Sequence, residues 1–146
     1  MFTYNIQLAG YDYKQYDEKG EITLAQFKDV LYSFPWEEQM KKADELKEGC
    51  SATVSVVNTM DETSLWVSVA SDAGKPLFLV GYVYYKEVKG MFGLGKAKTK
   101  KWVDIYALKN LDSAMEHFKL YFAGRKEEMV ANLSREDKFD SMEAFQ

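Results

Sequence analysis

The chain has 146 residues, a common length for one domain, with 47% hydrophobic and 29% charged residues. No apolar run approaches the 18 or more residues that a membrane-spanning helix needs, so we exclude a membrane protein. The single cysteine, Cys50, excludes an internal disulfide and a cysteine-based zinc site. These features predict one domain over residues 1–146 and a reducing, cytoplasmic location.

Charge is unevenly distributed along the chain, whose formal net charge is -4. Residues 1–62 hold 12 acidic and 6 basic side chains, whereas residues 63–101 hold 2 acidic and 7 basic ones. This asymmetry predicts separate acidic and basic surfaces. The sequence pI near 5.1 argues against nucleic acid as the main partner.

In chain order, the first part of the sequence predicts one strand and two helices. Residues 2–8 alternate apolar and polar side chains, which is typical of a half-buried strand. The segment 11–20 has no clear period, and we expect a loop or an irregular hairpin return there. Thr23 and Gln26 form a capping box that opens a short helix, and Pro35 precedes a second helical pattern.

The rest of the sequence predicts a run of strands followed by a helix. Four segments have strand patterns, the third of them apolar on both faces as in a central strand: 52–56, 65–69, 77–85 and 102–108. A helical stripe follows at 111–122, and 125–133 is a candidate for a further short helix. The polar segment 134–146 is expected to be a loosely ordered tail.

This order of elements predicts an α+β fold. The most economical connection is an antiparallel sheet of about five strands, an N-terminal strand plus a four-strand meander, with the helices packed on one face.

A glycine-rich segment from Gly90 to Lys96 has the G-x-x-x-x-G-K spacing of a phosphate-binding loop. Ala97 stands where such a loop needs Ser or Thr to hold magnesium, and a strand follows instead of a helix, so we interpret the segment as a hairpin loop. Its lysines still suit a nucleic-acid backbone, a small ligand or an acidic protein surface, and a binding module of that kind remains an alternative. The basic candidate residues are Lys89, Lys96, Lys98, Lys100 and Lys101.

Nucleophilic catalysis would require Cys50 and His117, the only thiol and the only imidazole in the chain. Each also has an ordinary structural interpretation, as a packed thiol and as a partly exposed helix residue. One histidine excludes a histidine-based metal site, and the acidic segments lack the spacing of a calcium loop. We therefore predict a non-enzymatic protein without cofactor or metal, with a small Cys/His enzyme as the alternative.

Aromatic residues, at 15% of the chain, point to a binding surface. If Leu65, Val67 and Val69 face the helices, alternation turns Trp66 toward the second face of the sheet. We predict that neighbouring strands add aromatic residues and a carboxylate to that face, as in protein-binding hot spots. The candidate site is Trp66, Tyr82, Tyr84, Trp102, Asp104 and Tyr106. The alternative is that the N-terminal loop or a second copy of the chain, in a homodimer, covers this face.

Four segments that span most of the chain carry a family resemblance: GEITLAQF at 20–27, FPW at 34–36, LWV at 65–67 and FKLYFAG at 118–124. With them the chain resembles small bacterial immunity proteins of polymorphic and contact-dependent toxin systems. The resemblance implies a non-enzymatic inhibitor that occupies the active site or a neighbouring surface of a cognate toxin. Many such toxins are basic nucleases, which the acidic residues 1–62 would suit, whereas the basic loop departs from that pattern.

Overall fold

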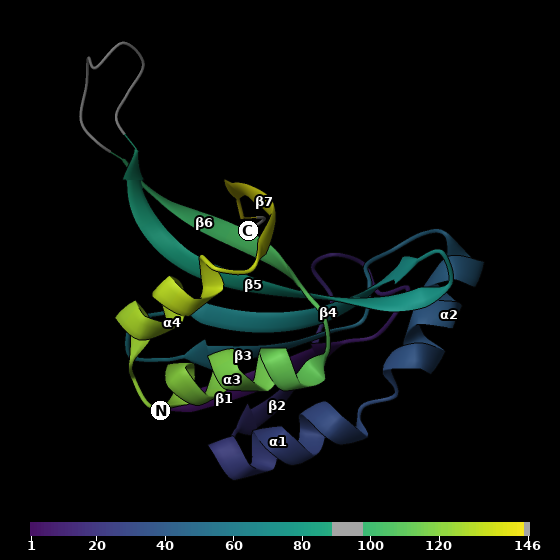
Figure 1. The fold of residues 1–146 in the computed structure, drawn as a ribbon, viewed down its shortest axis with the longest axis horizontal. Coiled ribbons are helices and arrows are strands. Elements are labelled where there is room, and N and C mark those ends of the chain that lie inside the picture. Colours follow the sequence, from purple (N-terminus) through teal and green to yellow (C-terminus); the bar gives the residue numbers. More distant parts are fainter. Residues whose placement is uncertain (89–97, 145–146) are drawn as a thin grey trace.

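A computed structural model describes residues 1–88 and 98–144 of the chain (Figure 1). These residues form one seven-stranded antiparallel sheet and four helices, so the α+β class is confirmed, but the sheet has more strands than the predicted five. The strands are β1 (Phe2–Gln7), β2 (Asp17–Glu21), β3 (Thr53–Asn58), β4 (Ser64–Asp72), β5 (Lys75–Val88), β6 (Lys98–Leu108) and β7 (Asp137–Glu143). The helices are α1 (Leu24–Ser33), α2 (Trp36–Leu46), α3 (Leu111–Phe122) and α4 (Lys126–Leu133).

The strand order across the sheet is β2-β1-β3-β4-β5-β6-β7, so the central strands form the expected meander. The two strands that the sequence did not predict are the two edges of the sheet. At one edge, β2 pairs with β1 within the segment expected to be a loop or an irregular return. At the other, β7 pairs with β6 and replaces the loosely ordered tail expected at 134–146.

The core lies between one face of the sheet and the helices. Phe27 of α1 and Phe118 of α3 are fully buried, and their rings stack with centroids 4.2 Å apart. The predicted capping box is present at the start of α1. The Thr23 side chain accepts a hydrogen bond from the backbone N–H of Gln26, and the Gln26 side chain accepts one from the backbone N–H of Thr23. Such helix starts and apolar stripes fix which helical faces meet the sheet.

Strand register decides which side chains share a face of the sheet. Leu65 of β4 lies in the core and is paired with Tyr82 of β5, which is in turn paired with Asp104 of β6. Paired residues point to the same side, so these three lie on the side that carries the helices. Trp66 is paired with Gly81 and points to the opposite side, which we call the open face.

Candidate functional site

The sequence-predicted aromatic site is divided between the two faces of the sheet. By their strand register, five of its residues lie on the helix-bearing side of the sheet: Tyr82, Tyr84, Trp102, Asp104 and Tyr106. Of the six, Trp66 alone lies on the open face. The prediction that all six share the face turned away from the helices is therefore wrong. The reason is that β5 is apolar on both faces, so its alternation does not indicate which residues face the core.

Three of the five residues come together in a pocket of about 480 Å³, which we call the tyrosine pocket. Tyr82 and Tyr84 of β5 and Asp104 of β6 line it from the sheet. Asp61 and Thr63, which precede β4, and Lys126 and Val130 of α4 line the other side, and Tyr85 completes it. Aromatic rings, two carboxylates and an ammonium group thus meet in one concavity, which is the composition expected of a binding site.

Asp104 is held in place by a chain of hydrogen bonds. The Tyr84 hydroxyl donates to Asp104 Oδ2 at 3.0 Å, and the Ser141 hydroxyl of β7 donates to Oδ1 at 2.5 Å. Trp102 Nε1 donates to Ser141 Oγ at 2.8 Å, and Lys138 Nζ lies 3.9 Å from Oδ1. The edge strand β7 therefore fixes the carboxylate that the sequence singled out.

The opposite wall of the pocket is built on a second polar network. Lys126 donates to Asp61 Oδ2, and both the backbone and the hydroxyl of Thr63 donate to Asp61 Oδ1. Burial acts to raise the pKa of Asp61, but these hydrogen bonds outweigh it and lower the pKa. The Thr63 hydroxyl is also 2.9 Å from the hydroxyl of the fully buried Tyr121, which ties this wall to the core.

The two pocket tyrosines are stacked, with ring centroids 5.3 Å apart and planes 19° from parallel. Burial and the hydrogen bond to Asp104 raise the pKa of Tyr84 to about 12, so its hydroxyl is a donor at neutral pH. Burial also raises the pKa of Tyr82. Among the described residues, the Tyr82 hydroxyl has no hydrogen-bond partner, and Tyr82 is one of the residues that line the pocket.

The basic candidate residues fall partly outside the described part of the chain. Lys89 and Lys96 lie in the segment 89–97, as does the phosphate-loop spacing. Lys98, Lys100 and Lys101 lie on β6, and Lys100 is directly opposite Lys86 of β5. Lys100 Nζ lies 3.6 Å from a Glu143 carboxylate oxygen, and Lys86 Nζ lies 3.8 Å from the centre of the Trp102 ring. Each lysine of this like-charged pair therefore has a compensating contact.

Cys50 and His117 occupy different surroundings. The Cys50 thiol lies 3.7 Å from the backbone oxygen of Leu8, and burial raises the thiol pKa, which disfavours the nucleophilic thiolate. His117 is buried on α3, with Nε2 3.4 Å from Glu136, rather than partly exposed as predicted. Within the described residues, no hydrogen bond joins the thiol to the imidazole, so the geometry does not assemble the Cys/His pair.

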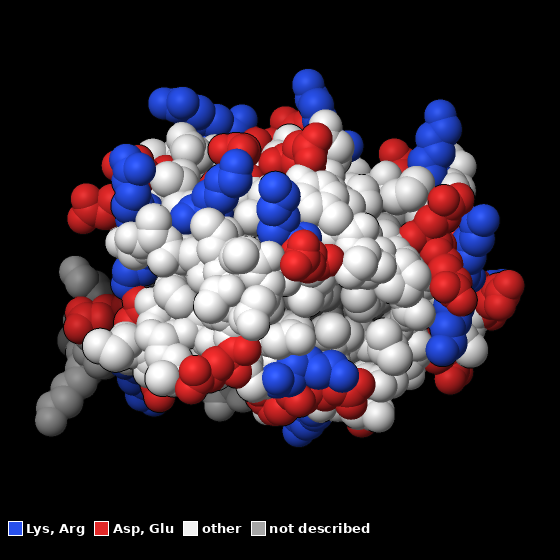
Figure 2. Space-filling view, turned by 90° about the horizontal axis from the view of Figure 1, so that it is seen from below, with Lys and Arg blue, Asp and Glu red and all other residues white. Residues whose placement is uncertain are grey.

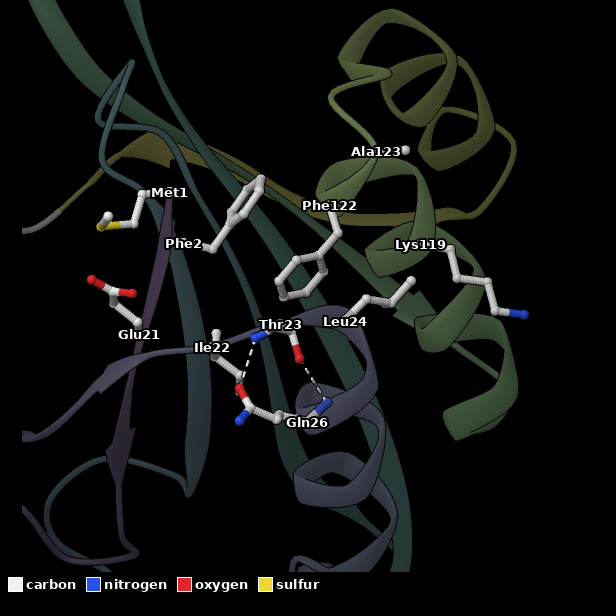
Figure 3. Close-up of a pocket in the computed structure, with 10 residues that line it drawn as sticks. All are labelled: Met1, Phe2, Glu21, Ile22, Thr23, Leu24, Gln26, Lys119, Phe122 and Ala123. Carbon is white, nitrogen blue, oxygen red and sulfur yellow. Dashed lines mark hydrogen bonds between the residues drawn. The ribbon is translucent and has the colours of Figure 1, made fainter.

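A further pocket of about 670 Å³ lies beside the start of β1 and the adjoining ends of α1 and α3 (Figure 3). Phe2 and Phe122 both line it, and their rings pack at a tilt with centroids 4.7 Å apart. Thr23 and Gln26 at its margin bond each other, as the dashed lines show. The described residues that line this pocket include no tyrosine, in contrast to the tyrosine pocket.

On one face of the folded protein, charge is more evenly mixed than the sequence asymmetry predicts. Figure 2, seen from the side where α1 and β2 lie in Figure 1, shows acidic and basic side chains interspersed around this face, without a broad patch of one sign.

In the described part of the chain, no three His, Cys, Asp or Glu side chains gather as metal ligands do. None of the described helices is both long and apolar enough to cross a membrane.

Comparison of the chain with protein-family models, with curated proteins and with solved structures found no match. The resemblance to immunity proteins therefore stays a prediction, and any functional inference depends on the geometry described above.

Of the residues that line the tyrosine pocket, sequence reasoning missed Asp61, Thr63, Tyr85, Lys126 and Val130. Asp61 and Lys126 are 65 positions apart in the chain, and no local pattern links them. The one available signal was Asp61 beside Thr63 in a turn, which is typical of a side chain that bonds its own backbone.

Proposed function

We propose that this chain is a non-enzymatic binding protein that inhibits a cognate bacterial toxin by forming a stoichiometric complex, as an immunity protein does. The tyrosine pocket carries the proposal. Its walls combine stacked Tyr82 and Tyr84 with Asp104, and tyrosine rings near a charged group are frequent where one partner anchors a side chain of the other.

The internal bonding of the pocket supports this function. Asp104 is held by Tyr84 and Ser141, and Asp61 is held by Thr63 and Lys126, so the polar groups have fixed positions before a partner arrives. Such preorganisation reduces the side-chain entropy lost on association and favours tight binding. The mixed charges give orientation and selectivity to the partner group that enters.

The test is co-expression with the toxin encoded beside this protein, followed by calorimetry on the purified pair. We expect rescue of growth and a one-to-one complex. Tyr84→Phe and Asp104→Asn should weaken binding by about 2 kcal/mol or more, equivalent to about 30-fold in Kd.

Tyr32→Phe is the matched control, because Tyr32 donates to Asp112 in a second tyrosine–aspartate pair that is not part of the pocket. This variant should bind like the wild type. Absence of both rescue and complex formation would refute the function, and equal losses for Tyr84→Phe and Tyr32→Phe would refute the role of the pocket.

A second candidate function is binding of a nucleic acid, which the directly opposed Lys86 and Lys100 favour. Fluorescence anisotropy with a labelled single strand should then show affinity that falls steeply with salt. Lys100→Gln should reduce that salt dependence, and Lys41→Gln, which removes a lysine paired with Glu37 on α2, should not. Binding that is absent, or equally weakened by both variants, would exclude this candidate.

A further inference from the structure

The open face of the sheet has no charged side chain over most of its area. The registers place on it every second residue of β1 and β3, together with alternate residues of 64–70 in β4, 77–83 in β5 and 103–107 in β6. None of these outward residues is Asp, Glu, Lys or Arg. A sheet face of this breadth normally carries charges when it faces only water, and depletion of charge is the feature that marks interface cores.

The middle of the open face carries apolar side chains. Trp66 lies across the neighbouring strand, so close to Gly81 that a methyl group there would stand 2.1 Å from the indole. Leu79 and Ile105 flank this position on the same side of the sheet and are half-buried. The four helices pack on the other side, and the loop after β1 meets the margin of the open face at Gln7.

The area of this face is sufficient for a specific interface. One outward residue covers about 30 Å² of sheet, because strands are about 4.8 Å apart and alternate residues about 6.6 Å apart. Five strands with three or four outward residues each therefore present about 500–600 Å² per copy. Two copies would bury about 1,000–1,200 Å², which reaches the lower end of the range for specific protein interfaces.

We propose that the open face is the interface of a homodimer, in which a second copy of this chain packs sheet against sheet about a two-fold axis. Such an axis brings the same patch of both copies together, so a charged side chain on it would lie close to the like charge of the other copy. This patch has no charged side chain. Its polar side chains, such as Thr3, Asn5 and Ser55, both donate and accept hydrogen bonds and can therefore pair across the axis. Charged residues with the same orientation, such as Glu21 of β2 and Asp140 of β7, lie outside this patch on the edge strands, so a strongly charged partner finds no complementary charge within it. The inference is independent of the tyrosine pocket, which lies on the other side of the sheet.

Sedimentation equilibrium of the intact chain tests this proposal. The wild type should be dimeric at micromolar concentration. Ser55→Lys places an ammonium group next to Trp66 in the middle of the face, and its dimer should be about 100-fold weaker or worse, because each copy would bury an unpaired charge.

Ser71→Lys is the matched control, because Ser71 is an exposed serine of β4 with the parity of the helix-bearing side. This variant should dimerise like the wild type. Circular dichroism and thermal melting of both variants verify folding, and Thr53→Lys serves as a second variant if Ser55→Lys does not fold. A monomeric wild type, or a dimer that lysines at 55 and 71 affect equally, would overturn the proposal.

Discussion

The contact between Trp66 and Gly81 gives a quantitative test of the sheet register. Gly81→Ala puts a methyl group 2.1 Å from the indole Cε2, in a strand whose backbone is held by pairing on both sides. Overpacking of this kind costs about 1–3 kcal/mol. Replacing glycine within a strand recovers about 0.5–1 kcal/mol through the unfolded chain, so we expect a net loss of up to about 2.5 kcal/mol.

Urea unfolding followed by circular dichroism measures this change in the free energy of unfolding. The control is the same substitution in a Trp66→Leu background, where the ring is absent. There Gly81→Ala should be neutral or slightly stabilising, which gives a coupling energy of about 1–3 kcal/mol between the two sites, equal to the overpacking cost. If the alanine costs as much without the ring as with it, the packing of Trp66 on Gly81 is refuted.

Two further expectations concern the buried titratable groups. Burial lowers the pKa of His117 below its ordinary value of 6.5 despite the opposing effect of Glu136, so the unfolded chain binds the proton more strongly and stability is lost as the pH falls below about 6.5. Urea midpoints at about pH 7.5 and about pH 5.5 should differ more for the wild type than for His117→Gln, and equal differences would contradict this. Burial also raises the pKa of Cys50, so alkylation at neutral pH should be much slower in the folded protein than in urea, and equal rates would restore the thiol as a candidate nucleophile.

The sequence predicts the fold class and the central meander because both depend on local patterns. Alternation identifies β1, β3 and β4, and the capping box places the start of α1. The two edge strands lack this signal. β2 reads Asp-Glu-Lys-Gly-Glu, and β7 has mostly exposed side chains, so both are held by backbone pairing and polar contacts rather than by an apolar face.

The orientation of β5 and β6 could not be predicted from their own sequences. In β6, Val103, Ile105 and Ala107 resemble a core face, whereas Trp102 and Asp104 resemble a solvent face. The pairing of β5 with β4, and of β6 with β5, shows the opposite: Trp102 and Asp104 lie on the helix-bearing side, and Val103, Ile105 and Ala107 lie on the open face. Only long-range pairing distinguishes the alternatives, because a shift of one residue moves every side chain to the other side.

The correct orientation changes what the aromatic residues can do. On an open sheet face they would form one patch, but on the helix-bearing side Tyr82 and Tyr84, with Asp104, line a concavity between β5, β6 and α4. The core itself supports this concavity: Tyr121 packs edge-on against Phe2, with ring centroids 5.5 Å apart, while its hydroxyl bonds Thr63 at the pocket wall. Moving that wall would require moving a fully buried ring, which close packing resists. The tyrosine pocket is therefore rigid for the same reason that the core is stable, and a partner that fits it would bind without first having to reshape it.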